Sequence, residues 1–190
     1  MRGASRSAKD RVYPAPVPPL FTPRLVLLPL SRAMLEQRLM RPSFDLRCET
    51  PQGALDVHFP PQWPGDPLPL YPALLAGLPP DQDELRLTFA VVTRAAPEAI
   101  GQIGTHAPPD DTGAVEIGYG LSPSARGRGY ATEAVGALVQ HLHGQERIRT
   151  VTAQTALGNR ASERVLEKLG FVQTGLGWSP EDGDLTLWAH

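Results

Sequence analysis

Hydrophobic positions along the chain alternate between the spacing of strands and the spacing of helices. Strands are expected at residues 24–30, 85–93, 100–106, 115–121, 149–155, 171–175 and 185–189. Helices are expected at residues 32–40, 130–143 and 160–169. Ser31 is suited to cap the first of these helices, and Gly170 to end the last. Because helices are inserted among many strands, the pattern predicts an α+β domain built on a mixed sheet.

Residues 41–84 do not follow this regular pattern. They contain ten of the 21 prolines of the chain, and proline removes a backbone donor and interrupts strands and helices. Within them, residues 70–78 resemble a short helix. A long irregular segment in a compact domain is often functional, so residues 41–84 are expected to cover the substrate side. Residues 1–20 are expected to form a flexible N-terminal tail, and residues 21–190 a single domain.

The composition of the chain argues against several classes of function. The chain has 190 residues, 41% of them hydrophobic, which is enough for a sizeable core. A net charge of −2 argues against a nucleic-acid partner. The single cysteine, Cys48, and the spacing of the histidines predict neither a disulfide nor a metal site. No stretch approaches the ~18 apolar residues of a membrane span, and the basic start lacks an apolar signal core, so cytoplasmic residence without membrane binding is expected.

The most informative motif is Arg126-Gly-Arg-Gly-Tyr-Ala131, between an expected strand and an expected helix. A helix start carries unsatisfied N–H groups and the positive end of the helix dipole. Gly127 and Gly129 let an anion approach the backbone, and Arg126 and Arg128 add positive charge. These features predict a pyrophosphate site. The residues that a P-loop or a dinucleotide fingerprint requires are missing, and a tight turn without a ligand is the remaining alternative.

The strand before this motif has one face that is almost bare of side chains. Alternation places Glu116, Gly118 and Gly120 on that face, opposite the larger apolar residues. Glycines weaken a strand unless something approaches its backbone closely. An extended ligand chain lying against this strand is therefore expected.

Residues 116–134 (EIGYGLSPSARGRGYATEA) and 159–171 (NRASERVLEKLGF) resemble the GNAT acetyltransferase superfamily, and within it the ribosomal-protein N-terminal acetyltransferase branch. Arg126, Gly129 and Ala131 match its Gln/Arg-x-x-Gly-x-Gly/Ala motif. The resemblance is good over residues 85–190, loose over 24–40 and poor over 41–84. It implies a central, twisted, mostly antiparallel mixed sheet with flanking helices. Two splayed parallel strands, 115–121 and 149–155, would form a cleft for coenzyme A.

The resemblance also implies how acetyl-CoA, the co-substrate, is held. The loop amides would bind the pyrophosphate, and the backbone of strand 117–121 would bind the pantetheine arm as an added strand does. Asn159 would bond the pantetheine or its water, and Ser162 would lie near the thiol. The implied binding residues are Ile117, Tyr119, Leu121, Arg126, Gly127, Arg128, Gly129, Tyr130, Ala131, Thr132, Asn159 and Ser162.

Three residues are predicted to be catalytic: Glu116, Ser162 and Asn159. An amine must be neutral to attack a thioester, and Glu116 is the candidate base; its alternative role is a strand carboxylate paired with an arginine. Many superfamily members protonate the leaving thiolate with a tyrosine, but the matching position here is Leu166. Ser162, or a water on Asn159, remains as the donor. Asn159 is equally suited to cap helix 160–169.

The resulting hypothesis is an N-acyltransferase that moves an acetyl group from acetyl-CoA to a primary amine. The amine belongs to a protein N-terminus or a small molecule, and it attacks directly in a ternary complex of a monomer or homodimer. One alternative is a coenzyme A sensor or catalytically silent homologue, favoured by the missing tyrosine. Another is a protein-interaction module that uses residues 41–84. His106, which precedes a hairpin turn, receives no role.

Overall fold

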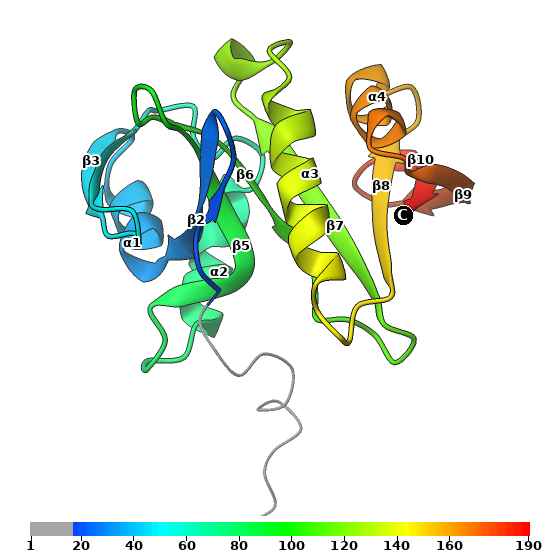
Figure 1. The fold of residues 1–190 in the computed structure, drawn as a ribbon, viewed down its shortest axis with the longest axis horizontal. Coiled ribbons are helices and arrows are strands. Elements are labelled where there is room, and N and C mark those ends of the chain that lie inside the picture. The colour runs from blue at the N-terminus through cyan, green and yellow to red at the C-terminus, as the bar shows by residue number, and fades with distance from the viewer. Residues whose placement is uncertain (1–16) are drawn as a thin grey trace, which may run out of the picture.

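An eight-stranded sheet is the centre of the computed structural model, which describes residues 17–190 (Figure 1). Its strand order is β1-β2-β5-β6-β7-β8-β10-β9. The strands are β1 (Leu20–Phe21), β2 (Leu25–Ser31), β5 (Glu84–Thr93), β6 (Ala99–Thr105), β7 (Ala114–Leu121), β8 (Thr150–Ala156), β9 (Val172–Ser179) and β10 (Gly183–Ala189). Neighbouring strands are antiparallel, except that β7 and β8 are parallel. The predicted α+β class and mostly antiparallel mixed sheet are confirmed.

The parallel pair separates part of the way along its length. β7 and β8 are paired from Ala114 and Thr150 to Ile117 and Ala153. Beyond Ile117, β7 remains paired with β6 as far as Leu121, whereas β8 continues against β10. Figure 1 shows the two strands diverging toward the end at which α4 lies. The predicted splay is therefore present, and it opens the sheet between two strands that remain anchored on their outer sides.

Two hydrophobic cores lie on opposite faces of the sheet. Leu25 and Leu27 of β2 belong to one cluster, and Val26 and Leu28 belong to the other. Successive strand residues point to opposite faces, so this alternation separates the two cores. The first core packs under α3 (Tyr130–His143) and α4 (Arg160–Lys168), and the second under α1 (Arg32–Met40) and α2 (Tyr71–Gly77). Ser31 caps α1 as predicted, accepting a hydrogen bond of 3.2 Å from the backbone N–H of Met34.

Residues 41–84 are more regular than the sequence pattern predicts. They form a separate hairpin, β3 (Phe44–Cys48) with β4 (Leu55–Phe59), then a 3₁₀ turn, η2 (Leu68–Leu70), and α2. The rings of Phe44 and Phe59 stack with centroids 4.6 Å apart, and Trp63 packs edge-on against Phe59. The sequence pattern did not predict this hairpin, because its strands are only five residues long. The many prolines around them also favour an irregular segment.

Residues 17–20, the last part of the expected tail, are among the described residues. Residues 1–16 of the expected tail lie outside the described residues. Val17 and Leu20, however, pack against the first core, and Leu20 pairs with Leu27. Their apolar contacts explain why this part belongs to the domain. Over residues 17–190, no helix is long and apolar enough to cross a membrane.

Candidate functional site

The predicted anion site lies where β7 leads into α3. After the 3₁₀ turn η3 (Pro123–Ala125), Gly127 and Gly129 adopt positive φ values of 74° and 79°. Gly129 is the N-cap residue of α3, and no side chain within the described residues caps this helix start by a hydrogen bond. A Cβ at Gly127 would meet no described atom within 4 Å. Both glycines therefore provide the left-handed turn. Gly127 leaves open space, and a Cβ at Gly129 would lie 3.4 Å from Arg24 Nη2, so a guanidinium lies close to a helix start that fits a phosphate group.

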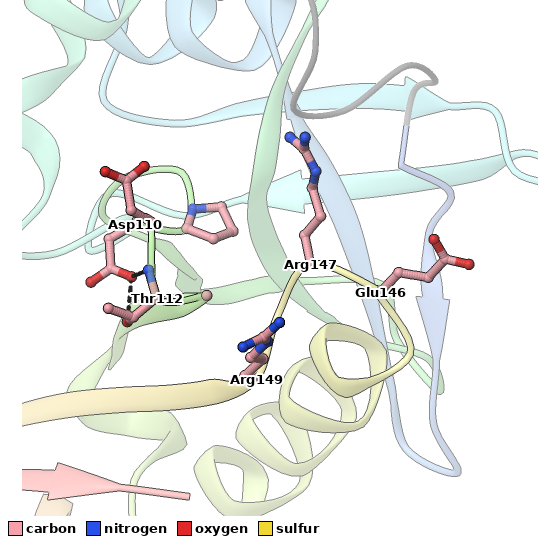
Figure 2. Close-up of a pocket in the computed structure, with 8 residues that line it drawn as sticks. Asp110, Thr112, Glu146, Arg147 and Arg149 are labelled. Atoms are coloured by element: carbon pink, nitrogen blue, oxygen red, sulfur yellow. Dashed lines mark hydrogen bonds between the residues drawn. The ribbon is translucent and has the colours of Figure 1, made fainter.

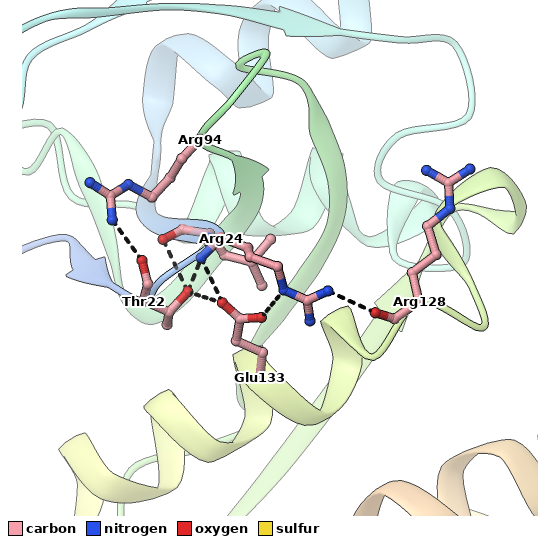
Figure 3. A network of polar contacts seen from close by, with 6 residues as sticks. Thr22, Arg24, Arg94, Arg128 and Glu133 are labelled. Atoms are coloured by element: carbon pink, nitrogen blue, oxygen red, sulfur yellow. Dashed lines mark hydrogen bonds and ion pairs between the residues drawn. The ribbon is translucent and has the colours of Figure 1, made fainter.

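The two arginines of the loop differ in their contacts. Arg126 donates from Nε to the carbonyl oxygen of Leu121 at 3.0 Å, so part of its guanidinium fastens the loop to the end of β7. The side chain of Arg128 extends away from the helix start (Figure 3). Both residues are exposed. Both arginines thus belong to the loop, but Arg128 directs its guanidinium away from the helix start and Arg126 has a structural contact with β7.

A network around Glu133 of α3 connects the loop to the β1–β2 turn (Figure 3). Glu133 accepts hydrogen bonds from the Thr22 hydroxyl at 2.6 Å and from the backbone N–H of Arg24 at 2.8 Å. Arg24 Nε is 2.6 Å from the other carboxylate oxygen, and its Nη1 donates to the Arg128 carbonyl at 2.9 Å. Burial favours a raised pKa of Glu133, but the bonds from Thr22 and Arg24 outweigh it and lower the pKa.

Arg24 is a residue of this site that sequence reasoning missed. Its guanidinium lies 4.7 Å from the ring centre of Tyr130 and holds the carbonyl of Arg128. It therefore contacts both neighbours of Gly129, the backbone of Arg128 and the ring of Tyr130. Its partners are more than 100 positions away in the sequence. The spacing of residues along the chain therefore does not predict this contact.

We predict that Arg24→Met weakens coenzyme A binding about fivefold, as expected for the loss of about 1 kcal/mol of loop-ordering hydrogen bonds. Isothermal titration calorimetry with coenzyme A measures the effect. Arg94→Met is the matched control, because Arg94 donates to the Thr22 carbonyl at 2.8 Å without a hydrogen bond to the loop among the described contacts. Equal affinities of the two variants would contradict a positioning role for Arg24.

A second polar cluster surrounds Glu116. It lies on the face of β7 that is turned away from the core under α3 and α4. One oxygen of Glu116 is 2.8 Å from His106 Nδ1, and the other accepts from Gln154 Nε2 at 2.7 Å. The hydrogen bond to Glu116 raises the pKa of His106, although burial acts against it. The bond from His106 is also the main cause of the lowered pKa of Glu116. The partner of Glu116 is thus a histidine rather than the arginine considered above.

The predicted bare face of β7 is only partly bare. A Cβ built on Gly118 would lie 2.3 Å from His106 Nε2, so the imidazole occupies the space of the missing side chain. At Gly120, a Cβ would meet no described atom within 4 Å, and that part of the face is open. Gly118 accommodates a side chain of this chain, and Gly120 is the glycine that leaves room for a ligand.

Asn159 and Ser162 lie together at the start of α4, next to the widened end of the parallel pair. Asn159 Oδ1 accepts from the backbone N–H of Ser162 at 3.2 Å, which confirms the capping role. The Tyr119 hydroxyl donates to the Ser162 carbonyl at 3.1 Å, and burial raises the pKa of Tyr119 to about 12. Leu166 is fully buried in the first core. Leu166 is thus a core residue, and the contact of the helix start with Tyr119 of β7 is made by the backbone carbonyl of Ser162.

Two cavities in the described part of the chain, residues 17–190, lie away from the predicted site residues. One of about 400 Å³ lies beside the first residues of β7 and β8 and is polar (Figure 2). Its charged lining comes from Asp110, Asp111, Glu146, Arg147 and Arg149. Another, of about 470 Å³, lies between β2, α1 and β3. In the part of the chain described, no group of three or more His, Cys, Asp or Glu residues is arranged to hold a metal.

Sequence comparisons agree with this geometry. Residues 72–172, more than half of the chain, match the acetyltransferase (GNAT) domain family. The chain is 33% identical over 85 residues to YjdG of Bacillus subtilis (strain 168), named an uncharacterized N-acetyltransferase, covering 45% of this chain and 51% of YjdG. With YoaA of the same organism, named likewise, it is 30% identical over 95 residues, covering 50% of this chain and 54% of YoaA. The chain thus spans about half the length of these relatives.

Solved structures show the same fold. A GNAT-family acetyltransferase from Bacillus anthracis has a TM-score of 0.61 at 18% identity, with 90% of this chain and 97% of that chain covered. The ribosomal L7/L12 α-N-protein acetyltransferase RimL, in complex with coenzyme A, has a TM-score of 0.57 at 18% identity, with 89% and 94% covered. At these identities the likeness concerns the fold alone. Together with the family match over residues 72–172, it places the chain in the GNAT acetyltransferase domain family.

Proposed function

We propose that this protein is an N-acetyltransferase that transfers an acetyl group from acetyl-CoA to a primary amine. The observation that carries the proposal is the splay of β7 from β8 beyond Ile117, next to a helix start that follows two left-handed glycines. A thin ligand chain fits between the strands while its phosphates reach the helix start. Membership of the GNAT family and the solved relative with coenzyme A support this choice of ligand.

The residues present suit the two ends of such a ligand. Backbone amides from Arg126 to Thr132 would hold the pyrophosphate, and the edge of β7 from Ile117 to Leu121 would hold the pantetheine arm. Bound acetyl-CoA supplies a thioester, which is the activated acyl group. A backbone N–H of this part of β7 would bind the oxygen that becomes negative during transfer. Ser162, or a water held by Asn159, would donate a proton at the sulfur.

The acceptor amine would enter on the face of β7 that carries Glu116. Gln102 pairs with Gly120 and therefore shares this face, and its side chain accepts from the Tyr71 hydroxyl at 2.7 Å. Tyr71 belongs to α2, so residues 41–84 lie beside the proposed acceptor side. This arrangement supports the expectation that the segment contributes to amine selection. The hydrogen-bonded pair of Glu116 and His106 would take up the amine proton there.

A catalytically silent homologue is the second candidate, because Leu166 is a core residue and offers no proton donor. Incubating the protein with acetyl-CoA and a panel of primary amines distinguishes the two. Peptide N-termini, polyamines, free amino acids and aminoglycosides make up the panel, and free thiol is measured. Release of thiol that depends on one class of amine supports the transferase. Tight coenzyme A binding without thiol release from any amine supports the silent homologue.

Coenzyme A is expected to raise the thermal unfolding midpoint. A ligand at 100 times its Kd stabilises the folded state by ~2.7 kcal/mol, which for a domain of this size raises the midpoint by roughly 5–10 °C. Differential scanning fluorimetry measures the shift, with ADP as a control that has a pyrophosphate but no pantetheine arm. The absence of any shift with coenzyme A would refute the cofactor assignment and, with it, the proposed function.

A further inference from the structure

We infer that Nε2 of His106 is the atom that takes the proton from the acceptor amine, and that Glu116 and Gln154 orient its ring. The inference rests on the proposed function and assigns a role to a residue outside the two family motifs. His106 follows β6, whereas Glu116 and Gln154 belong to β7 and β8. Three strands therefore contribute one side chain each to a single hydrogen-bonded chain.

The contacts of Glu116 make it an orienting group. Each of its carboxylate oxygens is engaged, one with His106 Nδ1 at 2.8 Å and the other with Gln154 Nε2 at 2.7 Å. The bonds from His106 and Gln154 both lower the pKa of Glu116, so the carboxylate is a weaker base than an ordinary glutamate. A carboxylate bonded to Nδ1 fixes the tautomer in which Nδ1 carries the hydrogen and Nε2 is free to accept one.

The position of Nε2 suits a proton acceptor at the cleft. It lies over Gly118, within 2.3 Å of where a Cβ would be, and Gly118 is the first residue of β7 beyond its pairing with β8. The side chain of His106 is 62% exposed and that of Glu116 is 30% exposed. The imidazole is therefore the more accessible of the two groups to an amine on this face of β7.

The proton count of the transfer is consistent with one acceptor at this position. The ammonium group gives one proton to His106 Nε2, and the nitrogen lone pair then forms the C–N bond with the acyl carbon. The C–S bond breaks, and its electron pair remains on the sulfur. The nitrogen loses a second proton, which ends on the sulfur as a thiol. His106 returns its proton to solvent, so the products are the amide, free coenzyme A and one released proton.

The pH dependence follows from the charged groups around His106. Glu116 of β7 is the charge that acts on the pKa of His106. Gln154 of β8 and Gly118 of β7 are uncharged, and β5 places Leu87 and Thr88 against Gly104 of β6. Because Glu116 raises the pKa and the neutral imidazole is the active form, the rate should rise with pH through the pKa of His106. Removing the charge of Glu116 should move that rise to lower pH.

The test compares His106→Gln and Glu116→Gln with His58→Gln. His58 is a suitable control, since its Nδ1 is also 2.8 Å from a carboxylate, that of Asp45, on the separate β3–β4 hairpin. With the best amine of the panel, His106→Gln should reduce kcat/KM by about 10²- to 10⁴-fold and remove the rise with pH. Its affinity for coenzyme A should be that of the wild type. Glu116→Gln should shift the rise to lower pH, and His58→Gln should change neither property.

A second readout does not depend on activity. NMR titration of the histidine side chains in the ligand-free protein should show a lower pKa of His106 in Glu116→Gln than in the wild type. An unchanged pKa would overturn the pairing, and a His106→Gln variant with wild-type kcat/KM and pH profile would overturn the role of His106. In both cases, thiol release by the wild type would leave the proposed function standing. A wild type that releases no thiol with any amine would refute both proposals.

Discussion

Gly129→Glu is expected to abolish measurable binding of coenzyme A. Gly129 is the N-cap of α3 with φ of 79°, and its neighbours would present their amides to the pyrophosphate. A glutamate there places a negative charge in the site that the helix start makes attractive for anions, and competes with the ligand for the guanidinium of Arg24 beside it. A loss of more than about 100-fold in affinity, about 2.7 kcal/mol, should be seen by calorimetry.

Gly129→Gln separates the effect of charge from that of backbone strain. Any residue other than glycine at this φ costs about 1–2 kcal/mol, and glutamine has the size of glutamate without its charge. Both variants should therefore lose similar thermal stability without ligand, and Gly129→Gln should retain far more affinity than Gly129→Glu. Equal affinities of the two variants would mean that no anion binds beside Gly129.

Trp63→Ala is expected to destabilise the protein by about 3–5 kcal/mol, the usual cost of removing a large buried aromatic side chain. Trp63 has no exposed surface, and its indole Nε1 donates to the Gly101 carbonyl at 2.9 Å. Its ring packs edge-on against Phe59 at 4.7 Å and Tyr71 at 5.8 Å. The substitution leaves a cavity and removes the indole hydrogen bond to Gly101, where residues 41–84 contact the sheet. Urea denaturation measures the loss.

Trp178→Ala is the matched control for this change. Trp178 lies on the edge strand β9 and is 68% exposed, so its removal should change the free energy of unfolding by no more than about 0.5 kcal/mol. If both variants lose the same small amount, the aromatic cluster is not part of the stabilising core. Because Tyr71 of this cluster bonds Gln102 beside the proposed acceptor side, we also expect Trp63→Ala to weaken amine selection.

The sequence by itself determined α1 and the part of the fold that begins at β5. The bounds of α1 and α3 were predicted to the residue, and the strands from β5 onward within about two residues at most ends. Beginning at β5, hydrophobic spacing of 2 or 3.6 residues coincides with local signals such as Gly170 after α4. The family resemblance lies in the same part. The glycine turn at the start of α3, where we propose that the pyrophosphate binds, could also be predicted, because its glycines, arginines and helix start are adjacent in the sequence.

Only the tertiary structure decided which distant residues act together. Arg24 reaches the loop from the β1–β2 turn, and His106 contacts Glu116 on the neighbouring strand β7, which also brings in Gln154 of β8. The hairpin within residues 41–84 depends on the contact of Phe44 with Phe59 and Trp63 rather than on local pattern. Spacing along the chain carries information about neighbours on one strand or helix. It carries none about register between strands, and it is register that brings His106, Glu116 and Gln154 together.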